Sequence, residues 1–176
     1  MRDKKDTRVF FALWPDRILR ESLSRAGKTI PVQPPARRVP DYNLHLTLHF
    51  IGNVYPEQLA CLRQQARRVK GAGFDLVIDT QGCFGRARVA WLGCSTVPAA
   101  LQQLQQQLAR RLRHCDYQPE ARRYNPHVTV ARKITSVPEQ SAFSALPWRV
   151  ENFVLIESKA TDNGVEYCVI ETYPLS

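Results

Sequence analysis

The sequence predicts an α+β protein with two pseudo-symmetric lobes, helices packed outside, around a central cleft. Short apolar runs typical of strands alternate with amphipathic helical patterns. Each half of the chain also repeats one order: a strand opening with Arg-Val, a helix, a basic proline-containing loop and a strand carrying His-x-Thr. Arg8 precedes His45 by 37 residues and Arg88 precedes His127 by 39 (45 − 8 and 127 − 88). This repetition indicates an internal duplication, so we expect residues 1–176 to form one domain of two duplicated lobes.

The first half is expected to contain two strands and two helices. Pro15 and Asp16 suit the start of a helix, and Gly27 followed by a proline-rich segment suits its end. The first helix has an apolar face of Ile18, Leu19, Leu23 and Ala26. The elements in order are a strand over Arg8–Trp14, this helix, a proline-rich loop over Pro31–Pro40, the His45 strand closing at Gly52, and a helix from Pro56 to Gly71.

The second half is expected to repeat this order and then add a hairpin. The glycine-containing sequence "QGCFGRA" predicts a loop between two strands, and Asn163-Gly164 predicts a tight turn between the last two. The elements in order are strands over Phe74–Thr80 and Arg88–Gly93, a helix over Pro98–His114 with Leu101, Leu104, Leu108 and Leu112 on its core face, the His127 strand, and strands over Val150–Glu157 and Val165–Thr172.

Composition narrows the classes of partner and compartment. The chain has 25 Lys and Arg against 16 Asp and Glu, a net charge of +9, which favours a polyanion such as nucleic acid. Its five cysteines form no Cys-x-x-Cys, so we expect reduced thiols in a cytoplasmic protein rather than a disulfide framework or zinc site. The N-terminal segment has no apolar run long enough for a signal peptide or membrane span.

The repeated motif presents two imidazoles and two hydroxyls. Because side chains alternate along a strand, the leucines beside His45 and Thr47 point into the core while these two polar residues point outward. His127 and Thr129 are placed in the same way. One such motif is common in half-exposed strands, but two copies in matching positions indicate a shared site. Facing strands would put both pairs around one small cavity.

This set of groups suits acid–base chemistry on a phosphodiester without a metal. Histidine titrates near neutral pH, so one ring can accept a proton while the other donates one. The hydroxyls of Thr47 and Thr129 can donate to phosphate oxygens, and Arg132, just beyond the second motif, can offset phosphate charge. The residues alone leave open which histidine is the acid and which the base.

Other residues are weaker candidates. Trp14, at a strand end, and Tyr124, in the basic loop with Arg123, are the candidates for base stacking or RNA contact. His49 shares the parity of His45, and we expect it to pack at the strand end. Phe50 continues the parity of the buried leucines, so burial is expected for it.

The sequences "LHLTLHFIG", "NPHVTVAR" and "RVFFALWP" resemble the 2H phosphoesterase superfamily, in particular the RNA 2′,3′-cyclic phosphodiesterases, also called 2′-5′ RNA ligases. The resemblance extends from about residue 8 to residue 173 and covers all four motif positions. It implies lobes each built on an antiparallel sheet. It also implies hydrolysis of a terminal 2′,3′-cyclic phosphate to a 2′-phosphomonoester, with reversible ATP-independent 2′-5′ ligation in some members. His45 would then be the proton donor and His127 the proton acceptor, with Thr47, Thr129 and Arg132 on the phosphate.

The implied partner is RNA with a 2′,3′-cyclic phosphate end, such as a tRNA fragment, bound by a monomer that needs no cofactor. Two alternatives stay open from the sequence. A non-catalytic RNA-binding module would use the basic cleft alone, and a related phosphodiesterase would act on small cyclic nucleotides. Arginines in the loops before both motif strands, Arg37, Arg38, Arg122 and Arg123, favour a longer RNA.

Overall fold

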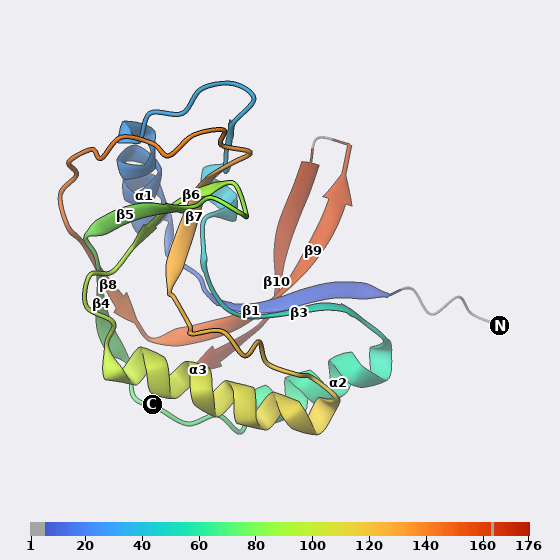
Figure 1. Cartoon of the computed structure of the whole chain (residues 1–176). Helices are drawn as coiled ribbons and strands as arrows, with labels where there is room; N and C mark the ends of the chain where they lie inside the picture. Colours follow the sequence, from blue (N-terminus) through green and yellow to red (C-terminus); the bar gives the residue numbers. More distant parts are fainter. Residues whose placement is uncertain (1–5, 163) are drawn as a thin grey trace.

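The computed structural model describes residues 6–162 and 164–176 (Figure 1). Three α-helices, two short 3-10 helices and ten strands are found in this part of the chain. The helices are α1 (Arg17–Thr29), η1 (Asp41–Asn43), α2 (Pro56–Ala66), α3 (Ala99–Leu112) and η2 (Arg113–Cys115). The strands are β1 (Thr7–Leu13), β2 (Arg37–Arg38), β3 (Leu46–Val54), β4 (Phe74–Ile78), β5 (Thr80–Phe84), β6 (Val89–Gly93), β7 (His127–Arg132), β8 (Leu146–Val150), β9 (Asn152–Thr161) and β10 (Gly164–Pro174).

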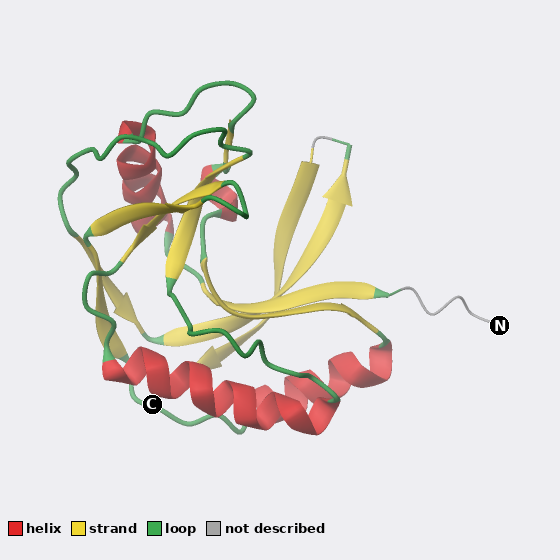
Figure 2. Ribbon diagram, viewed as in Figure 1, coloured by secondary structure: helices red, strands yellow, loops and turns green. Residues whose placement is uncertain are grey.

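The main sheet is antiparallel and consists of two halves that meet at a narrow seam (Figure 2). Its strand order is β10-β9-β1-β3-β7-β6-β5, with β2 added on β7 and with β4 and β8 forming a separate pair. At the seam, β3 and β7 pair only through Leu46 and Val128. The predicted α+β class with two lobes of antiparallel strands is confirmed. The structure adds that the two halves of the main sheet are joined by this one pair of residues.

The helices cover the outer faces of the two halves. α1 follows β1 in sequence but packs on β6, β7 and β8, whereas α2 and α3 pack against each other and α3 also lies against β3 (Figure 2). Each half of the sheet is therefore covered by a helix from the other half of the chain. A hydrophobic core of buried residues from Val9 to Leu175 runs through both halves.

Helix α1 begins as the sequence predicts but ends later. The Asp16 carboxylate accepts a hydrogen bond from the Leu19 amide at 2.8 Å and caps the first turn. Gly27 was expected to end the helix, yet α1 continues past it to Thr29. A Cβ at position 27 would come within 3.0 Å of Val130 on β7, which explains why a glycine stands there. The glycine thus allows close packing rather than a stop. Ile18, expected on the apolar face, is 68% exposed.

A β-bulge in β3 changes which side chains are buried. Phe11 pairs with His49 and Ala12 with Thr47, so Leu48 is an extra residue on β3. Beyond this point the alternation is reversed: His49 joins the buried side and Phe50 is 47% exposed, with the Arg8 guanidinium 5.0 Å from its ring centre. The predicted burial of Phe50 is wrong because the extra residue shifts the parity.

The region before α3 differs most from the prediction. Most of "QGCFGRA" is strand β5, which pairs with β6 from Thr80 opposite Gly93 to Phe84 opposite Val89. A Cβ at position 82 would lie only 2.3 Å from the Trp91 ring, so this glycine lets an aromatic side chain lie across the strand.

Strand β8 was not predicted, and it pairs with β4. The predicted turn at Asn163 lies outside the described residues.

The expectation of five reduced cysteines is wrong. Cys61 on α2 and Cys115 on η2 form a disulfide between residues 54 apart in sequence, while Cys83, Cys94 and Cys168 are free thiols. Spacing along the chain could not reveal this pair, because it depends on α2 and η2 packing side by side. None of the described helices has the length and apolar character to cross a membrane.

Candidate active site

The two histidines meet at the seam of the sheet. His45 directly precedes β3 and His127 begins β7, and the residues that follow them, Leu46 and Val128, are the one pair joining these strands. Both histidines are half-buried while Leu46 and Val128 are fully buried, as strand alternation requires. The predicted approach of the two motif strands is therefore present.

Thr47 and Thr129 lie on the same side of their strands as the histidines, and both are half-buried. The Thr47 hydroxyl is 3.1 Å from His45 Nε2. Thr129 is opposite Trp91 on β6, next to a register shift in that pair of strands. The two motifs thus place an imidazole and a hydroxyl on each side of the seam.

Both imidazoles are held by the same backbone contact. His45 Nδ1 lies 2.7 Å from the Asn43 carbonyl oxygen, and His127 Nδ1 lies 2.7 Å from the Asn125 carbonyl oxygen. A carbonyl only accepts, so Nδ1 carries the hydrogen in each ring. Nε2 of each neutral ring is then left as the proton acceptor, and the Thr47 hydroxyl donates to Nε2 of His45. The arrangement fixes tautomer and orientation before a substrate binds.

Sequence reasoning missed the contribution of the asparagines, although an Asn stands two residues before each histidine. Asn43 is buried; its Nδ2 donates to the Val165 carbonyl at 2.7 Å, and its Oδ1 accepts from the Tyr167 amide at 3.3 Å. The first histidine loop is thereby attached to β10. Asn125 is exposed and its side chain has no comparable buried role. The repeated Asn was the available signal, but only the fold distinguishes the two.

Aromatic rings surround each histidine, more closely around His45. The ring of His45 lies 4.8 Å from Phe10, 5.1 Å from Tyr167 in an edge-on arrangement and 5.9 Å from Trp14 in a stacked one. Phe84 and Trp91 lie 4.9 and 6.3 Å from the His127 ring. The packing limits ring rotation and removes water from one side of each imidazole.

Burial and nearby positive charge lower the pKa of both histidines. Loss of hydration is the largest cause and brings the pKa of His45 to about 4, with the charges of Arg132 and His127 acting in the same direction and the bond to Asn43 opposing them. The pKa of His127 is lowered by burial first, then by Arg122 and Arg132, against the bond to Asn125. In the free protein both rings are therefore neutral at pH 7.

Arg132 is exposed at the end of β7, and its charge acts on both imidazoles. The predicted role of Arg132 beside a phosphate stays a prediction. Among the other predicted arginines, Arg38 donates to the carbonyls of Gly27 and Ile30 at 2.6 and 2.9 Å. Its guanidinium thus holds the C-terminal end of α1, which makes it a structural rather than an RNA-contacting group.

The three candidates for RNA contact lie in different surroundings. Trp14 is half-buried against His45, with the Arg20 guanidinium 5.6 Å from its ring centre. The hydroxyl of Tyr124 donates to the Thr47 carbonyl at 3.0 Å, so this residue holds the first motif strand in place. Arg123 is exposed and lines a neighbouring groove. Stacking on a base by Trp14 or Tyr124 stays a prediction.

His49 is a structural residue, but it lies within β3 rather than at the strand end. It is buried, with Nε2 2.8 Å from the Gln105 carbonyl oxygen and Nδ1 3.2 Å from the Tyr117 hydroxyl. It therefore ties β3 to α3, away from the seam. Within residues 6–162 and 164–176, no group of three or more His, Cys, Asp or Glu side chains is placed to hold a metal ion.

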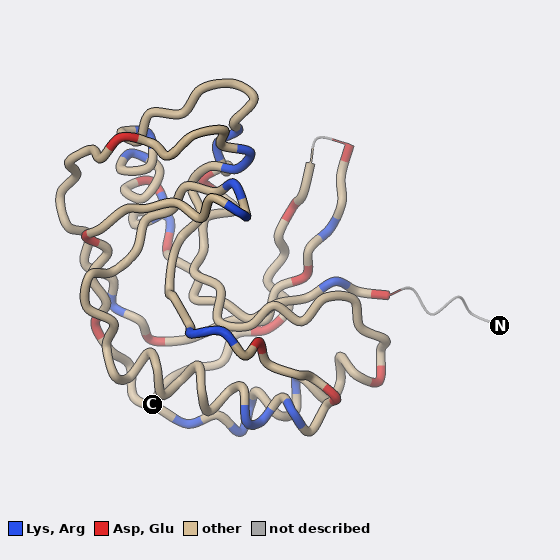
Figure 3. The backbone as a smooth tube through the Cα atoms, viewed as in Figure 1, with Lys and Arg blue, Asp and Glu red and all other residues tan. Residues whose placement is uncertain are grey.

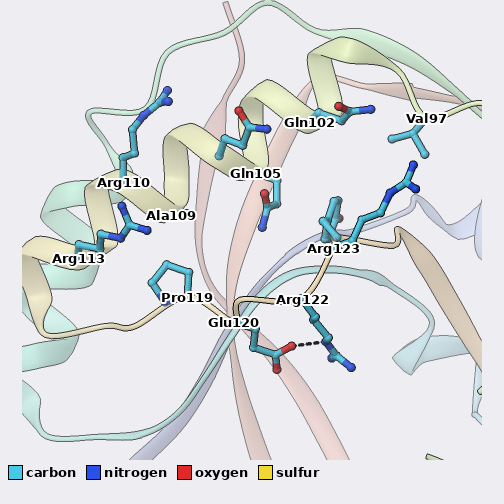
Figure 4. A pocket seen from close by; sticks show the side chains of 12 residues that line it. Val97, Gln102, Gln105, Ala109, Arg110, Arg113, Pro119, Glu120, Arg122 and Arg123 are labelled. Atoms are coloured by element: carbon cyan, nitrogen blue, oxygen red, sulfur yellow. Dashed lines mark ion pairs between the residues drawn. The ribbon is translucent and has the colours of Figure 1, made fainter.

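A cavity of about 570 Å³ lies between α3 and the segment before β7 (Figure 4). Gln105 and Arg110 line it from the helix, and Arg122, Arg123 and Tyr124 line it from the loop. Neither motif histidine is among its lining residues. The cavity is linked to the seam by Tyr124, which lines the cavity and donates a hydrogen bond to the Thr47 carbonyl.

The comparisons with known proteins agree with this geometry. The chain is 30% identical over 173 residues to the RNA 2′,3′-cyclic phosphodiesterase of Escherichia coli strain K12, which covers 96% of this chain and 97% of that protein. It is 27% identical over 186 residues to the protein of that name from Thermus thermophilus, covering 96% and 90%.

Solved structures give the same result. The crystal structure of E. coli LigT complexed with 3′-AMP superposes with a TM-score of 0.86 at 29% identity, covering 98% of this chain and 99% of that one. The TT0787 protein of Thermus thermophilus superposes with a TM-score of 0.78 at 25% identity, covering 96% and 97%. The family model of the 2′-5′ RNA ligase superfamily matches residues 19–162, and the chain belongs to that superfamily.

Proposed function

We propose that this protein is an RNA 2′,3′-cyclic phosphodiesterase that opens a terminal 2′,3′-cyclic phosphate to a 2′-phosphomonoester. The observation that carries the proposal is the pair of imidazoles at the seam, each held through Nδ1 by a carbonyl so that Nε2 is available for proton transfer. Relatives named for this activity cover nearly the whole chain. Ligation of a cyclic phosphate end to a 5′-hydroxyl, forming a 2′-5′ bond without ATP, follows the same steps at the same site with the 5′-hydroxyl in place of water.

His127 acts as the base and His45 as the acid. Neutral His127 takes a proton from water, and the water oxygen bonds to phosphorus in line with the 3′ oxygen. His45 donates its proton to that oxygen as the P–O3′ bond breaks, which leaves the 2′-phosphate. The free His45 ring is neutral at pH 7. Its proton is taken up as the anionic phosphate binds, because a nearby negative charge raises the pKa of an imidazole.

The phosphate is held by Thr47, Thr129 and Arg132. Each hydroxyl can donate to a nonbridging oxygen, and the guanidinium can offset the charge that builds up on phosphorus. When the phosphate enters, the Thr47 hydroxyl turns from His45 Nε2 to the substrate. Trp14, Tyr124 and Arg123 contact the rest of the RNA. No metal ion or cofactor has a role in these steps.

The proposed substrate is the cyclic phosphate end of an RNA such as a tRNA fragment. The net charge of +9 supports a polyanionic substrate. We place the enzyme in the cytoplasm as a monomer, with residues 1–176 forming one domain of two duplicated lobes. The continuous core supports the single domain, and the identical tethering of the two histidines supports the duplication.

Product analysis tests the proposal. A short RNA ending in a 2′,3′-cyclic phosphate is incubated in EDTA with wild type, His45→Ala and His127→Ala, and the product end is identified by phosphorus NMR. A 2′-phosphate made by wild type and lost in both variants is expected. An unchanged RNA that still binds would indicate a binding module, and turnover of cyclic nucleotides alone would indicate the small-molecule phosphodiesterase.

A further inference from the structure

A basic groove lies next to the seam. Arg123 and Tyr124, which line it, are proposed above to contact the RNA, but its other arginines have no role in the mechanism. The groove is the cavity of about 570 Å³ between α3 and the segment before β7, and we call it the arginine groove after Arg110, Arg113, Arg122 and Arg123 (Figure 4). The first two arginines come from the last turns of α3 and the start of η2, and the other two come from the loop. The helix end and the loop that follows it thus form two walls of one hollow.

The charge of the groove is strongly positive. Four guanidiniums and one carboxylate, that of Glu120, are among its lining residues, a balance of +3 (4 − 1). Glu120 pairs with Arg122. In the described part of the chain, no carboxylate forms an ion pair with Arg110, Arg113 or Arg123, and all three are exposed. Figure 3 shows basic residues on α3 and on the loop before β7.

The walls between the arginines combine amide groups with apolar side chains, among them Val97, Ala109 and Pro119. Gln102, Gln105 and Gln106 line the helix side, so amide groups lie between the guanidiniums of Arg110 and Arg113 and the start of α3. Amides can donate and accept, which suits sugar hydroxyls and base edges, whereas guanidiniums suit phosphate oxygens. Together with the arginines, this mixture of polar and apolar groups fits a nucleic-acid strand.

The arginine groove is connected to the catalytic seam. Tyr124 lines the groove, and its hydroxyl donates to the Thr47 carbonyl at 3.0 Å. Arg122 lies close enough to His127 for its charge to lower the pKa of that imidazole. These two contacts place the groove next to the site proposed for the phosphate.

We infer that the arginine groove binds the backbone phosphates of the RNA on the 5′ side of its cyclic end. The inference rests on the proposed function, because a 2′,3′-cyclic phosphate occupies the last position of an RNA and the rest of the chain must leave in the 5′ direction. Guanidiniums bind phosphate oxygens through paired, charge-assisted hydrogen bonds. The groove thus makes the enzyme prefer a longer RNA over a cyclic mononucleotide.

The test compares substrates of different length. The groove variant is Arg110→Gln with Arg113→Gln. The control is Arg68→Gln with Arg111→Gln, which removes the same charge from positions outside the lining residues. KM and kcat are measured on a cyclic-phosphate RNA of about ten nucleotides and on a 2′,3′-cyclic mononucleotide, over a range of salt concentrations.

The groove variant is expected to raise KM for the longer RNA about tenfold and to leave the mononucleotide unaffected. The slope of the logarithm of KM for the longer RNA against the logarithm of the salt concentration should fall by about 2, which is about one for each lost phosphate contact. Normal mononucleotide turnover shows that fold and chemistry are intact. Equal losses in both variants, or a loss on the mononucleotide as well, would overturn the inference.

Failure of the proposed function is distinguished by a binding assay. If wild type turns over neither substrate, anisotropy with a labelled RNA ending in a 3′-phosphate still tests the groove. Weaker binding in the groove variant alone would support it. Unchanged RNA binding, or binding of an acidic peptide in preference to RNA, would overturn it.

Discussion

The surroundings of His45 and His127 differ although the two rings are held alike. Each Nδ1 donates to the carbonyl two residues earlier at 2.7 Å. Around His45, however, Phe10, Trp14 and Tyr167 come from two other strands and a strand end, whereas Phe84 and Trp91 of one hairpin surround His127. The difference indicates that packing makes two equally tethered imidazoles unequal, which acid–base catalysis requires.

Removing either imidazole should have the largest effect. His45→Ala and His127→Ala are each expected to lower kcat for a cyclic-phosphate RNA by about 10²–10⁴, the usual contribution of one acid or base. His114→Ala is the matched control, since His114 is exposed on η2 and belongs to neither motif. Steady-state kinetics checks the prediction. Loss of activity in only one of the two variants would show that a single histidine suffices.

Variants of the two asparagines should separate the role of the backbone carbonyl, which holds the histidine, from the role of the side chain, which attaches the loop to β10. Asn43→Ala removes two hydrogen bonds from a buried side chain to β10, so the free energy of unfolding should fall by about 1–3 kcal/mol with reduced activity. Asn125→Ala should change both by little, because its carbonyl remains and its side chain is exposed. Urea denaturation of both variants gives the comparison. Equal destabilisation would refute the difference between the two loops.

The low pKa of His45 makes stability fall in acid. The unfolded chain protonates this imidazole near its ordinary value of about 6.5, and the folded protein only near a pKa of about 4. Between these values the unfolded state binds more protons, so the free energy of unfolding falls as pH drops from about 6.5 to about 4 and is insensitive to this group above that range.

The loss is on the order of 1–3 kcal/mol, and the lowered pKa values of His49 and His127 add to it. Urea titrations of wild type and His45→Asn across this pH range measure it. The variant should lose part of the dependence. An identical profile in both proteins would place the acid sensitivity elsewhere.

Tyr124→Phe should have the smallest effect. It removes one hydrogen bond, from the phenol hydroxyl to the Thr47 carbonyl, and costs about 1 kcal/mol of stability. A rise of a few fold in KM is expected because Thr47 then holds the phosphate less firmly. Thermal unfolding and kinetics on a cyclic mononucleotide measure both. A stability unchanged by the substitution would show that the bond has no net value.

The four motif residues of the candidate site were predictable from the sequence because they form a local, repeated pattern. His45, Thr47, His127 and Thr129 were found by alternation along a strand and by repetition, and both hold in three dimensions. The α3 helix was equally predictable from its leucine spacing.

What could not be predicted depends on distant contacts. The bulge that exposes Phe50 depends on how β1 pairs with β3. The Cys61–Cys115 bond depends on two helices packing together. Strand β5 was mistaken for a loop because Gly82 was taken as a loop residue, whereas it makes room for the Trp91 ring of the neighbouring strand. The role of Asn43 likewise required the position of β10.

The division of labour between the two histidines is tested most directly with a substrate that needs no acid. In a cyclic phosphate whose 3′ bridging oxygen is replaced by sulfur, the thiolate leaves without a proton. The account predicts that His45→Ala turns over this substrate at a rate within about tenfold of wild type, while His127→Ala stays impaired by about 10² or more. Rescue of His127→Ala instead, or of neither variant, would contradict the assignment of His45 as the acid.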